Sequence, residues 1–265
     1  MKILLAVAAG VVLLALGIWG IALPGEALVA QLEKAGSGGA FTVEVSGFRK
    51  GLFYTFHCRS VILKKGDTPL FSLDNLRGTV HILSLFRLKL PVSFEAESGG
   101  GKAAGSAELL GKGGQVHLSL EGADMAAVPF FGVAGMKGRG GLSGKLSLDG
   151  ERGELSFSLR EAKMESGSFM GVNVPFEAFH TVRGSLAIAR DSLKVHSLVM
   201  EGKGIYARLK GSFTGAAPGS SSGAVLEIMP DAAFEDTSGL LSLLAAFKVS
   251  PGYYVIPLKG VAFLS

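Results

Sequence analysis

Apolar and polar residues alternate with a period of two through most of the chain beyond residue 40. The alternation is clearest in the segments 41–46, 92–97, 115–121, 142–148, 154–160 and 205–213. Successive side chains of a β-strand point to opposite faces, so each segment predicts a strand with one apolar and one polar face. Such strands are typical of antiparallel sheets that keep one face in water. The sequence therefore predicts a mainly β fold.

Glycine usage supports strands and turns over a helical bundle. The chain has 39 glycines in 265 residues, about twice the average usage, and glycine destabilises helix interiors. Asp149-Gly150 lies between two alternating segments and predicts a β-hairpin. Residues 183–215 predict three strands joined by turns at 190–192 and 202–204, and similar glycine-serine segments recur elsewhere. We expect an elongated antiparallel sheet.

Other segments predict loops and helices. The glycine- and serine-rich stretches 99–105 and 215–223 predict flexible loops. Residues 26–35 and 238–247 place leucine and alanine at helical spacing and predict one short helix each. Two short helices cannot cover the apolar face of so many strands. The sheet should therefore curve and close on itself, pack as a sandwich, or leave an apolar trough.

The N-terminus predicts a membrane anchor. Residues 3–23 form an uncharged run of 21 residues, which as a helix spans about 31 Å, the thickness of a bilayer core. Lys2 precedes the run, so the positive-inside rule places the rest of the chain on the far side. We expect an N-terminal transmembrane helix in residues 1–24 and a β-rich domain in residues 25–265. A cleavable signal peptide ending near residue 22 is the alternative, although the run exceeds the usual ~7–15 residues.

Composition excludes several protein classes. Hydrophobic residues make up 48% of the chain and charged residues 18%, which rules out wholesale disorder. The net charge of +4 comes from interspersed acidic and basic residues, so we expect no nucleic-acid partner. Cys58 is the single cysteine, which excludes an intramolecular disulfide and cysteine-rich metal sites.

Three segments resemble catalytic or nucleotide-binding motifs, but each lacks a neighbouring element or a residue that the motif requires. Residues 219–223 match the nucleophile elbow around Ser221, but they lie in a serine-rich loop that no predicted helix follows. Residues 202–207 match a dinucleotide fingerprint, but the next segment alternates as a strand. Gly111-Lys112 lacks the first glycine and the Ser or Thr of a P-loop. We interpret all three as loops or turns.

The remaining reactive side chains are scattered. The five histidines occur singly, at positions 57, 81, 117, 180 and 196. His57 and Cys58 are neighbours on a predicted strand and should point to opposite faces, so Cys58 is expected to be structural. The sequence therefore predicts no catalytic, cofactor-binding or metal-binding residue and a protein that is not an enzyme. A hydrolase that uses Ser221 or Cys58 is the rival interpretation. The 17 phenylalanines suit either a packed core or a trough lined for acyl chains.

The residues also carry a family resemblance. The N-terminal span, the following helix, the stretch 72–78 leading into Ser84-Leu85-Phe86, and the closing residues 252–260 together resemble the type II secretion system protein N (GspN) family. The unit 183–215 resembles the strand repeats of AsmA-like proteins.

The resemblance implies a protein of the bacterial inner membrane, anchored by residues 3–23, with its C-terminal domain in the periplasm. In the GspN reading it is a non-enzymatic accessory or structural component of type II protein secretion, with other secretion-system proteins as partners. In the AsmA-like alternative it binds or transfers phospholipid between inner and outer membrane through an apolar β-groove. The resemblance adds no catalytic residues and no cofactor.

Overall fold

The computed structural model of the protein describes most of the chain beyond the predicted membrane segment. The described residues are 24–36, 41–82, 84, 89–108, 114–133, 136–150, 152–165, 167–169, 172–174, 176–189, 192–214, 223–234 and 240–258. The predicted membrane segment 3–23 and almost all of the predicted loop 215–223 lie outside them. Within the described ranges, no helix has the length and apolar character needed to cross a membrane.

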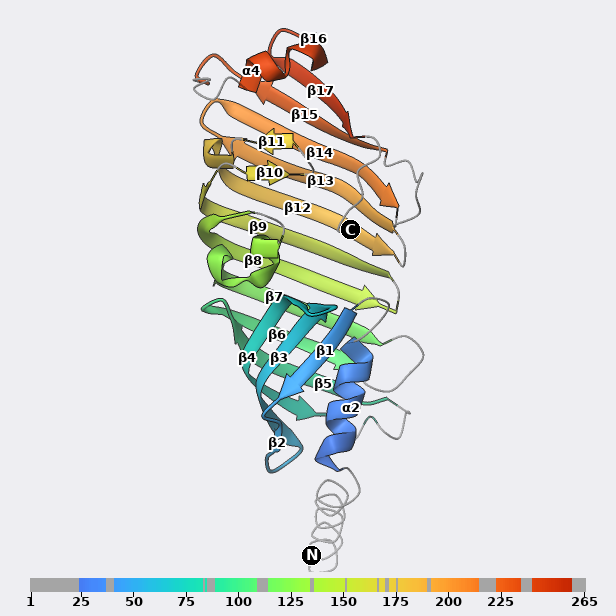
Figure 1. Cartoon of the computed structure of the whole chain (residues 1–265). Helices are drawn as coiled ribbons and strands as arrows, with labels where there is room; N and C mark the ends of the chain where they lie inside the picture. The colour runs from blue at the N-terminus through green and yellow to red at the C-terminus, as the bar shows by residue number, and fades with distance from the viewer. Residues whose placement is uncertain are drawn as a thin grey trace, which may run out of the picture. The chain divides into compact units, whose positions relative to one another are not determined.

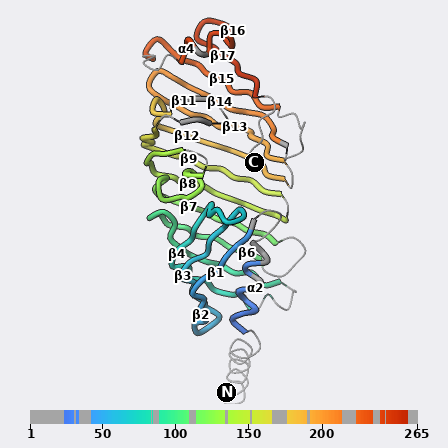
Figure 2. Tube along the Cα trace, in the orientation of Figure 1, coloured from blue at the N-terminus to red at the C-terminus, as the bar shows by residue number. Residues whose placement is uncertain are grey.

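The fold is mainly β, as predicted, with one large antiparallel sheet of 15 strands and a separate two-stranded pair (Figures 1 and 2). The strands are β1 Phe41–Ser46, β2 Arg49–Lys50, β3 Thr55–Lys65, β4 Thr68–Val80, β5 Pro91–Ser98, β6 Gly101–Glu108, β7 Gln115–Asp124, β8 Gly138–Asp149, β9 Arg152–Met164, β10 Gly167–Phe169, β11 Val172–Val174, β12 Phe179–Ala189, β13 Ser192–Gly202, β14 Ile205–Thr214, β15 Ala224–Pro230, β16 Lys248–Ser250 and β17 Tyr253–Leu258. Helical segments are α2 Gly25–Gly36, η3 Met125–Ala127, α3 Pro129–Val133, η4 Phe176–Ala178, α4 Leu240–Leu243 and η5 Ala245–Phe247.

The predicted hairpins are confirmed by the strand register. β8 and β9 pair up to Asp149 opposite Arg152, and Gly150 in the turn has φ 59°, a left-handed conformation that suits glycine. The unit 183–215 forms β12, β13 and β14 in consecutive antiparallel pairs. The period-two pattern therefore determines how these strands pair. A shift of one residue in the pairing register would move every apolar side chain to the solvent-exposed face.

The predicted flexible loop at 99–105 is wrong. Gly99 and Gly100 form a tight turn, and Gly101 opens strand β6. A Cβ on Gly101 would lie 2.3 Å from the backbone nitrogen of Ala123. These glycines therefore allow two backbones to approach closely, a role that the sequence pattern alone does not distinguish from a flexible loop.

Helical segments are present in both predicted regions, but their boundaries differ from the predicted ones. The helix expected at 26–35 is α2, which begins at Gly25 and ends at Gly36. The helix expected at 238–247 is reduced to α4 and η5, and strand β16 starts at Lys248 before the expected stop at Pro251. Helix α3 was not predicted, because its five residues are too few to show a helical period.

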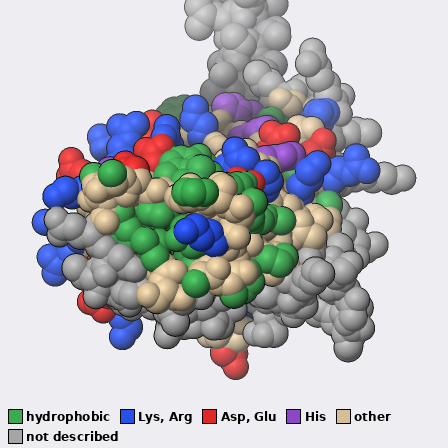
Figure 3. All heavy atoms as spheres, turned by 90° about the horizontal axis from the view of Figure 1, so that it is seen from above, with side chains coloured by type: hydrophobic (Ala, Val, Ile, Leu, Met, Phe, Trp, Pro, Cys, Tyr) green, Lys and Arg blue, Asp and Glu red, His purple; other side chains and the backbone are tan. Residues whose placement is uncertain are grey.

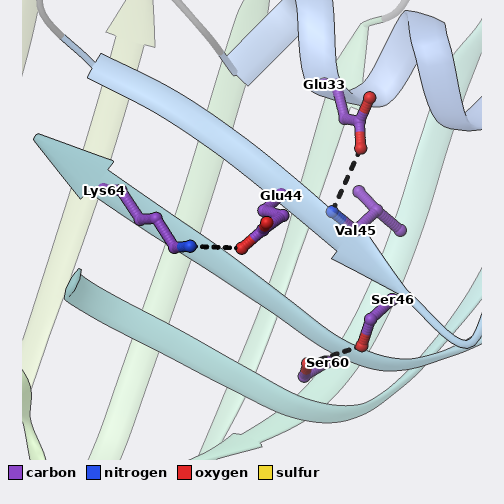
Figure 4. Close-up of polar contacts among 6 residues, drawn as sticks. All are labelled: Glu33, Glu44, Val45, Ser46, Ser60 and Lys64. Carbon is purple, nitrogen blue, oxygen red and sulfur yellow. Dashed lines mark hydrogen bonds and ion pairs between the residues drawn. The ribbon is translucent and has the colours of Figure 1, made fainter. Parts of the chain in front are cut away.

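The chain divides into two compact units. Unit 1 comprises residues 1–97 and 104–114. Its strands follow the order β1-β3-β4-β5, with β2 on β3, and α2 packs against β1. The Glu33 carboxylate accepts a hydrogen bond from the Val45 backbone N–H at 3.3 Å, next to the Glu44–Lys64 ion pair (Figure 4). This contact covers the edge strand β1, a common protection of sheet edges against pairing with other chains.

Unit 2 comprises residues 98–103 and 115–265. Its strands follow the order β7-β8-β9-β12-β13-β14-β15-β17-β16. Its core residues lie on one face of this sheet and include Ala123, Leu142, Leu159, Val182, Val195, Met200, Ala207, Leu209, Phe213, Leu226, Ile228, Tyr254 and Ile256, all buried. The apolar residues at every second position of each strand all lie on this face. The alternation in the sequence therefore determines which residues form the core.

Replacing Gly101 with alanine is expected to lower the free energy of unfolding by about 1–3 kcal/mol, because the new Cβ would overlap the backbone of β7. Urea unfolding of the detergent-solubilised full chain, followed by circular dichroism, measures this change. The matched control is Gly141→Ala on β8, where nothing lies within 4 Å of the added Cβ. This control should change stability by less than about 0.5 kcal/mol. Equal effects of the two substitutions would contradict the close-approach explanation.

Candidate functional site

The register of unit 2 aligns apolar side chains into rows that cross neighbouring strands. Leu118 on β7 pairs with Leu146 on β8, which pairs with Leu155 on β9. Leu155 pairs with Leu186 on β12, and Leu186 pairs with Val195 on β13. Directly opposite side chains have Cβ atoms about 4.5–5.5 Å apart. The row is therefore a continuous line of aliphatic contacts across five strands.

Parallel rows lie on either side of this one. The first is Val116, Leu148, Gly153, Ile188 and Leu193, at the ends of the strands that meet in tight hairpins. The other is Ala123, Leu142, Leu159, Val182 and Met200, at the opposite ends of the same strands. The latter row is buried throughout, whereas every residue of the hairpin-end row is only half-buried. One apolar face is thus sealed at one end and accessible at the other.

This difference in burial follows from the segments inserted between β7 and β8 and between β9 and β12. The segments η3 and α3 follow the end of β7, and β10, β11 and η4 connect β9 to β12, so all enter at the same strand ends. They contribute the buried side chains Met125, Val128 and Phe176. Figure 1 shows α3 and the β10–β11 pair lying over one face of the sheet. At the hairpin ends, the described residues include no helix or strand inserted between β8 and β9 or between β12 and β13.

We call the accessible part of this face the apolar strip. It consists of Val116, Leu118, Leu146, Leu148, Leu155, Phe157, Leu186, Ile188 and Leu193, all half-buried. The Phe157 ring lies against its cross-strand neighbour Gly184, where an added Cβ would be 2.3 Å from Cε1. Glycine at this position therefore leaves room for the ring to lie along the sheet. No strip residue carries a polar side chain, so the strip offers only apolar contact.

The opposite face of unit 2 is polar. Its side chains include His117, which hydrogen-bonds the Ser147 hydroxyl at 3.1 Å, and Arg183, which forms an ion pair with Glu201. Glu227 on β15 also lies on this face, but it is buried, with only 5% of its surface exposed. Its carboxylate accepts hydrogen bonds from Arg208 at 2.9 Å and contacts the Lys210 ammonium at 2.7 Å.

The surroundings of Glu227 hold its carboxylate ionised. The hydrogen bond from Lys210 and the positive charge of Arg208 lower the pKa of Glu227 and outweigh the opposing effect of burial. Arg208 lies directly opposite Glu227 in the register. The network therefore links β14 to β15 in one alignment, and we assign it a structural role.

The structure describes one of the two residues on which the hydrolase interpretation rests. Cys58 is 0% exposed, and burial raises the pKa of its thiol to about 11, which makes it a poor nucleophile. His57, its neighbour in sequence, lies opposite Arg49 and Arg77 in the register. Ser221 lies outside the described residues. The hydrolase interpretation therefore stays a prediction at Ser221.

The other motifs and the histidines are placed as follows. Residues 202–204 form the β13–β14 turn, and a strand rather than a helix follows, as the alternation predicted. Residues 111–113 lie outside the described part of the chain. His81 hydrogen-bonds Ser93 and His180 contacts Thr181, while His196 is exposed. Among the described residues, no group of His, Cys, Asp or Glu could hold a metal ion.

Two exposed apolar features were missed in the sequence. Leu52 and Phe53 are 75% and 67% exposed in the β2–β3 loop, and Val249 is 65% exposed on β16. The only sequence signal for the first pair is its position directly after Gly51 and the charged residues 49–50. Val249 gives no signal, because a single apolar residue in a short strand is common on either face.

Replacing Glu227 with glutamine is expected to lower the free energy of unfolding by about 1–2 kcal/mol at pH 7, since Arg208 and Lys210 lose their anionic partner but keep contact with solvent. The folded-state pKa is lowered, so the carboxylate stabilises the fold fully above the unfolded pKa of ~4.3. This contribution is lost as the pH falls through the folded pKa.

Urea unfolding of both chains between pH 3 and pH 7 measures this dependence. The difference between Glu227→Gln and the unsubstituted chain should shrink as the pH falls below ~4.3. Glu201→Gln, which removes an exposed ion pair with Arg183, is the control and should cost less than about 0.5 kcal/mol. A pH-independent effect of Glu227→Gln would show that the charge plays no part.

Comparison with known proteins gives no relative from which to read a function. No family model matches the chain, and no curated protein or solved structure is significantly similar to it. The resemblance to the GspN family and to AsmA-like proteins therefore stays a prediction. The apolar strip is the feature of the described residues that points most directly to a binding function.

Proposed function

We propose that this protein is a non-enzymatic, membrane-anchored protein whose sheet binds the acyl chains of phospholipid along the apolar strip. The observation that carries the proposal is the contrast in burial on one sheet face. The row from Ala123 to Met200 is buried, whereas the nine residues of the apolar strip are only half-buried. Of the two functions implied by the sequence resemblance, this contrast favours the AsmA-like, lipid-binding one.

The dimensions of the strip suit an acyl chain. The accessible residues of one row, Leu118, Leu146, Leu155 and Leu186, cross the four strands β7, β8, β9 and β12, which at about 4.8 Å per strand spacing gives a length of about 14 Å. One leaflet of a bilayer is about 15 Å thick in its hydrocarbon region. A chain lying along a row would therefore contact aliphatic side chains over its whole length. The apolar area removed from water supplies the binding free energy.

The other parts of the proposal come from the sequence. The apolar run at 3–23 would hold the protein in the bacterial inner membrane, with the β-sheet in the periplasm. In this position the strip would receive phospholipid beside the membrane and could shield its chains from water during transfer toward the outer membrane. The role requires no catalytic group, consistent with a strip built only of aliphatic and aromatic side chains.

The second candidate is an accessory role in type II protein secretion, and the edge of unit 2 favours it. Strand β16 is last in the strand order, and Lys248, Val249 and Ser250 are all exposed. Figure 3 looks onto the end of unit 2 that carries β16, and hydrophobic side chains gather in the middle of this view. An exposed edge strand can accept a strand from a partner by backbone pairing. The partner in this case would be another component of the secretion system.

Lipid binding predicts where an acyl chain can be crosslinked. The full chain is reconstituted into vesicles of phosphatidylglycerol and phosphatidylcholine that carry a diazirine on the acyl chain, irradiated, digested and analysed by mass spectrometry. We expect crosslinks on the β8–β9 hairpin and on β12. Leu155→Asn should reduce them by about tenfold, since removing one leucine from the lipid contact costs about 1.5 kcal/mol or more.

The control is Ser156→Asn, the next residue of β9, which lies exposed on the polar face. It should leave the crosslinking unchanged. Crosslinks confined to residues 3–23 in every chain would contradict the proposal, because they would show that the lipid contacts the anchor and not the sheet.

The secretion role predicts a contact at β16. A photo-crosslinking amino acid at position 249, introduced in the native host, should capture a protein of the secretion system. The same amino acid at Arg152, which is exposed on the polar face of unit 2, should capture none. Absence of any secretion component among the proteins captured at position 249 would argue against this second candidate.

A further inference from the structure

The loop between β2 and β3 presents two adjacent large apolar side chains to solvent. Leu52 is 75% exposed and Phe53 is 67% exposed, more than any other large hydrophobic side chain among the described residues. Exposure of a single leucine is ordinary, but two neighbouring exposed apolar side chains at a loop tip point to a contact with another surface.

The backbone holds this loop in one shape. The Gly51 N–H donates to the Thr55 carbonyl at 2.9 Å, and the Thr55 N–H and hydroxyl both donate to the Leu52 carbonyl, at 3.1 and 2.6 Å. Phe53 and Tyr54 have φ angles of 51° and 64°, a left-handed conformation that costs non-glycine residues free energy. The loop therefore keeps its apolar tip exposed at a cost in stability, which indicates a functional constraint.

Basic residues surround the apolar tip. Arg49 on β2 lies opposite His57 on β3, and His57 lies opposite Arg77 on β4. Lys50 lies directly before the loop, and Arg49 and Arg77 are exposed. One carboxylate, Glu95, ends this row beside Arg77. An apolar tip with a basic flank is the combination that binds the interface of an anionic membrane.

The loop lies near the point where the chain leaves the predicted membrane segment. Helix α2 begins at Gly25, two residues after that segment, and an added Cβ on Gly25 would be 3.3 Å from the Phe48 ring. The Phe48 ring stacks on Phe56 of β3, with centroids 5.7 Å apart. From Phe48 to Leu52 the chain spans at most about 14 Å. Figures 1 and 2 show the N-terminal end of α2 and the β2 loop at the same end of unit 1.

We propose that Leu52 and Phe53 insert into the interface of the same membrane that residues 3–23 are predicted to cross, with Arg49 and Arg77 at the lipid phosphates. The proposal rests on the predicted membrane segment and is independent of lipid binding by the apolar strip. Two apolar side chains alone bind a bilayer weakly, but the tether keeps the loop at a high effective concentration near the surface. Insertion would give unit 1 a second point of attachment and fix its orientation on the bilayer.

The experiment measures the depth of the loop in the membrane. The full chain carrying Leu52→Cys is labelled with the environment-sensitive fluorophore NBD and reconstituted into vesicles of phosphatidylglycerol and phosphatidylcholine. Cys58 is fully buried and should not react, and the unsubstituted chain measures this background. The control is Asp67→Cys in the β3–β4 turn, at the other end of the 11-residue strand β3 and so roughly 33 Å away.

We expect blue-shifted emission at position 52 and protection from aqueous iodide. Quenching by lipids brominated on the acyl chain should be roughly threefold stronger there than at position 67, because an interfacial side chain reaches about 5–10 Å into the bilayer. Adding Phe53→Ser should reverse the shift, whereas adding Val249→Ser, at a similarly exposed residue of β16, should not. Replacing Arg49 and Arg77 with glutamine should reduce quenching in anionic vesicles only.

Two results would overturn the proposal. Equal access of iodide to positions 52 and 67 would place the loop in water. Protection from iodide without quenching by brominated lipid would assign the loop to a contact with protein, such as a second copy of the chain.

Discussion

Cross-strand register is the constraint on which the rest of the structure depends. Each strand of unit 2 carries its apolar residues at every second position, and the pairing aligns them with the apolar residues of both neighbours. Where the chain contains an extra residue, as at His196 on β13, the register shifts and the apolar face is restored beyond it. Rows such as Leu146, Leu155 and Leu186 exist only because this alignment continues from strand to strand.

The register also determines what the two faces can do. The polar face carries ion pairs and hydrogen bonds, of which the buried Glu227 network is the most specific. Among the described residues, the segments between β7 and β8 and between β9 and β12 cover the apolar face at one end of these strands. An apolar surface left accessible at the other end costs solubility unless something binds it. The proposed lipid binding would cover the accessible part of this apolar face.

Sequence patterns were sufficient for the strands with regular alternation, but they did not predict β6 or the segments that cover the apolar face. Alternation and the Asp149-Gly150 turn predicted the β8–β9 hairpin, because both signals are local and repeat over many residues. The segments η3 and η4 span three residues each and leave no periodic trace, so the sealed end of the apolar face could not be predicted. The glycines at 99–101 were misread as a loop, since the sequence does not show which backbone approaches them. The outward position of Leu52 and Phe53 depends on backbone angles that non-glycine residues seldom adopt.

The central claim is that the apolar strip binds lipid and is not the surface of a packed core. The most direct test is an experimental structure of the full chain purified from its own membrane without removal of lipid. The account predicts acyl-chain density lying along the rows that join Leu118, Leu146 and Leu155. Density showing the chain's own side chains packed over these rows, with no space for a ligand, would contradict it.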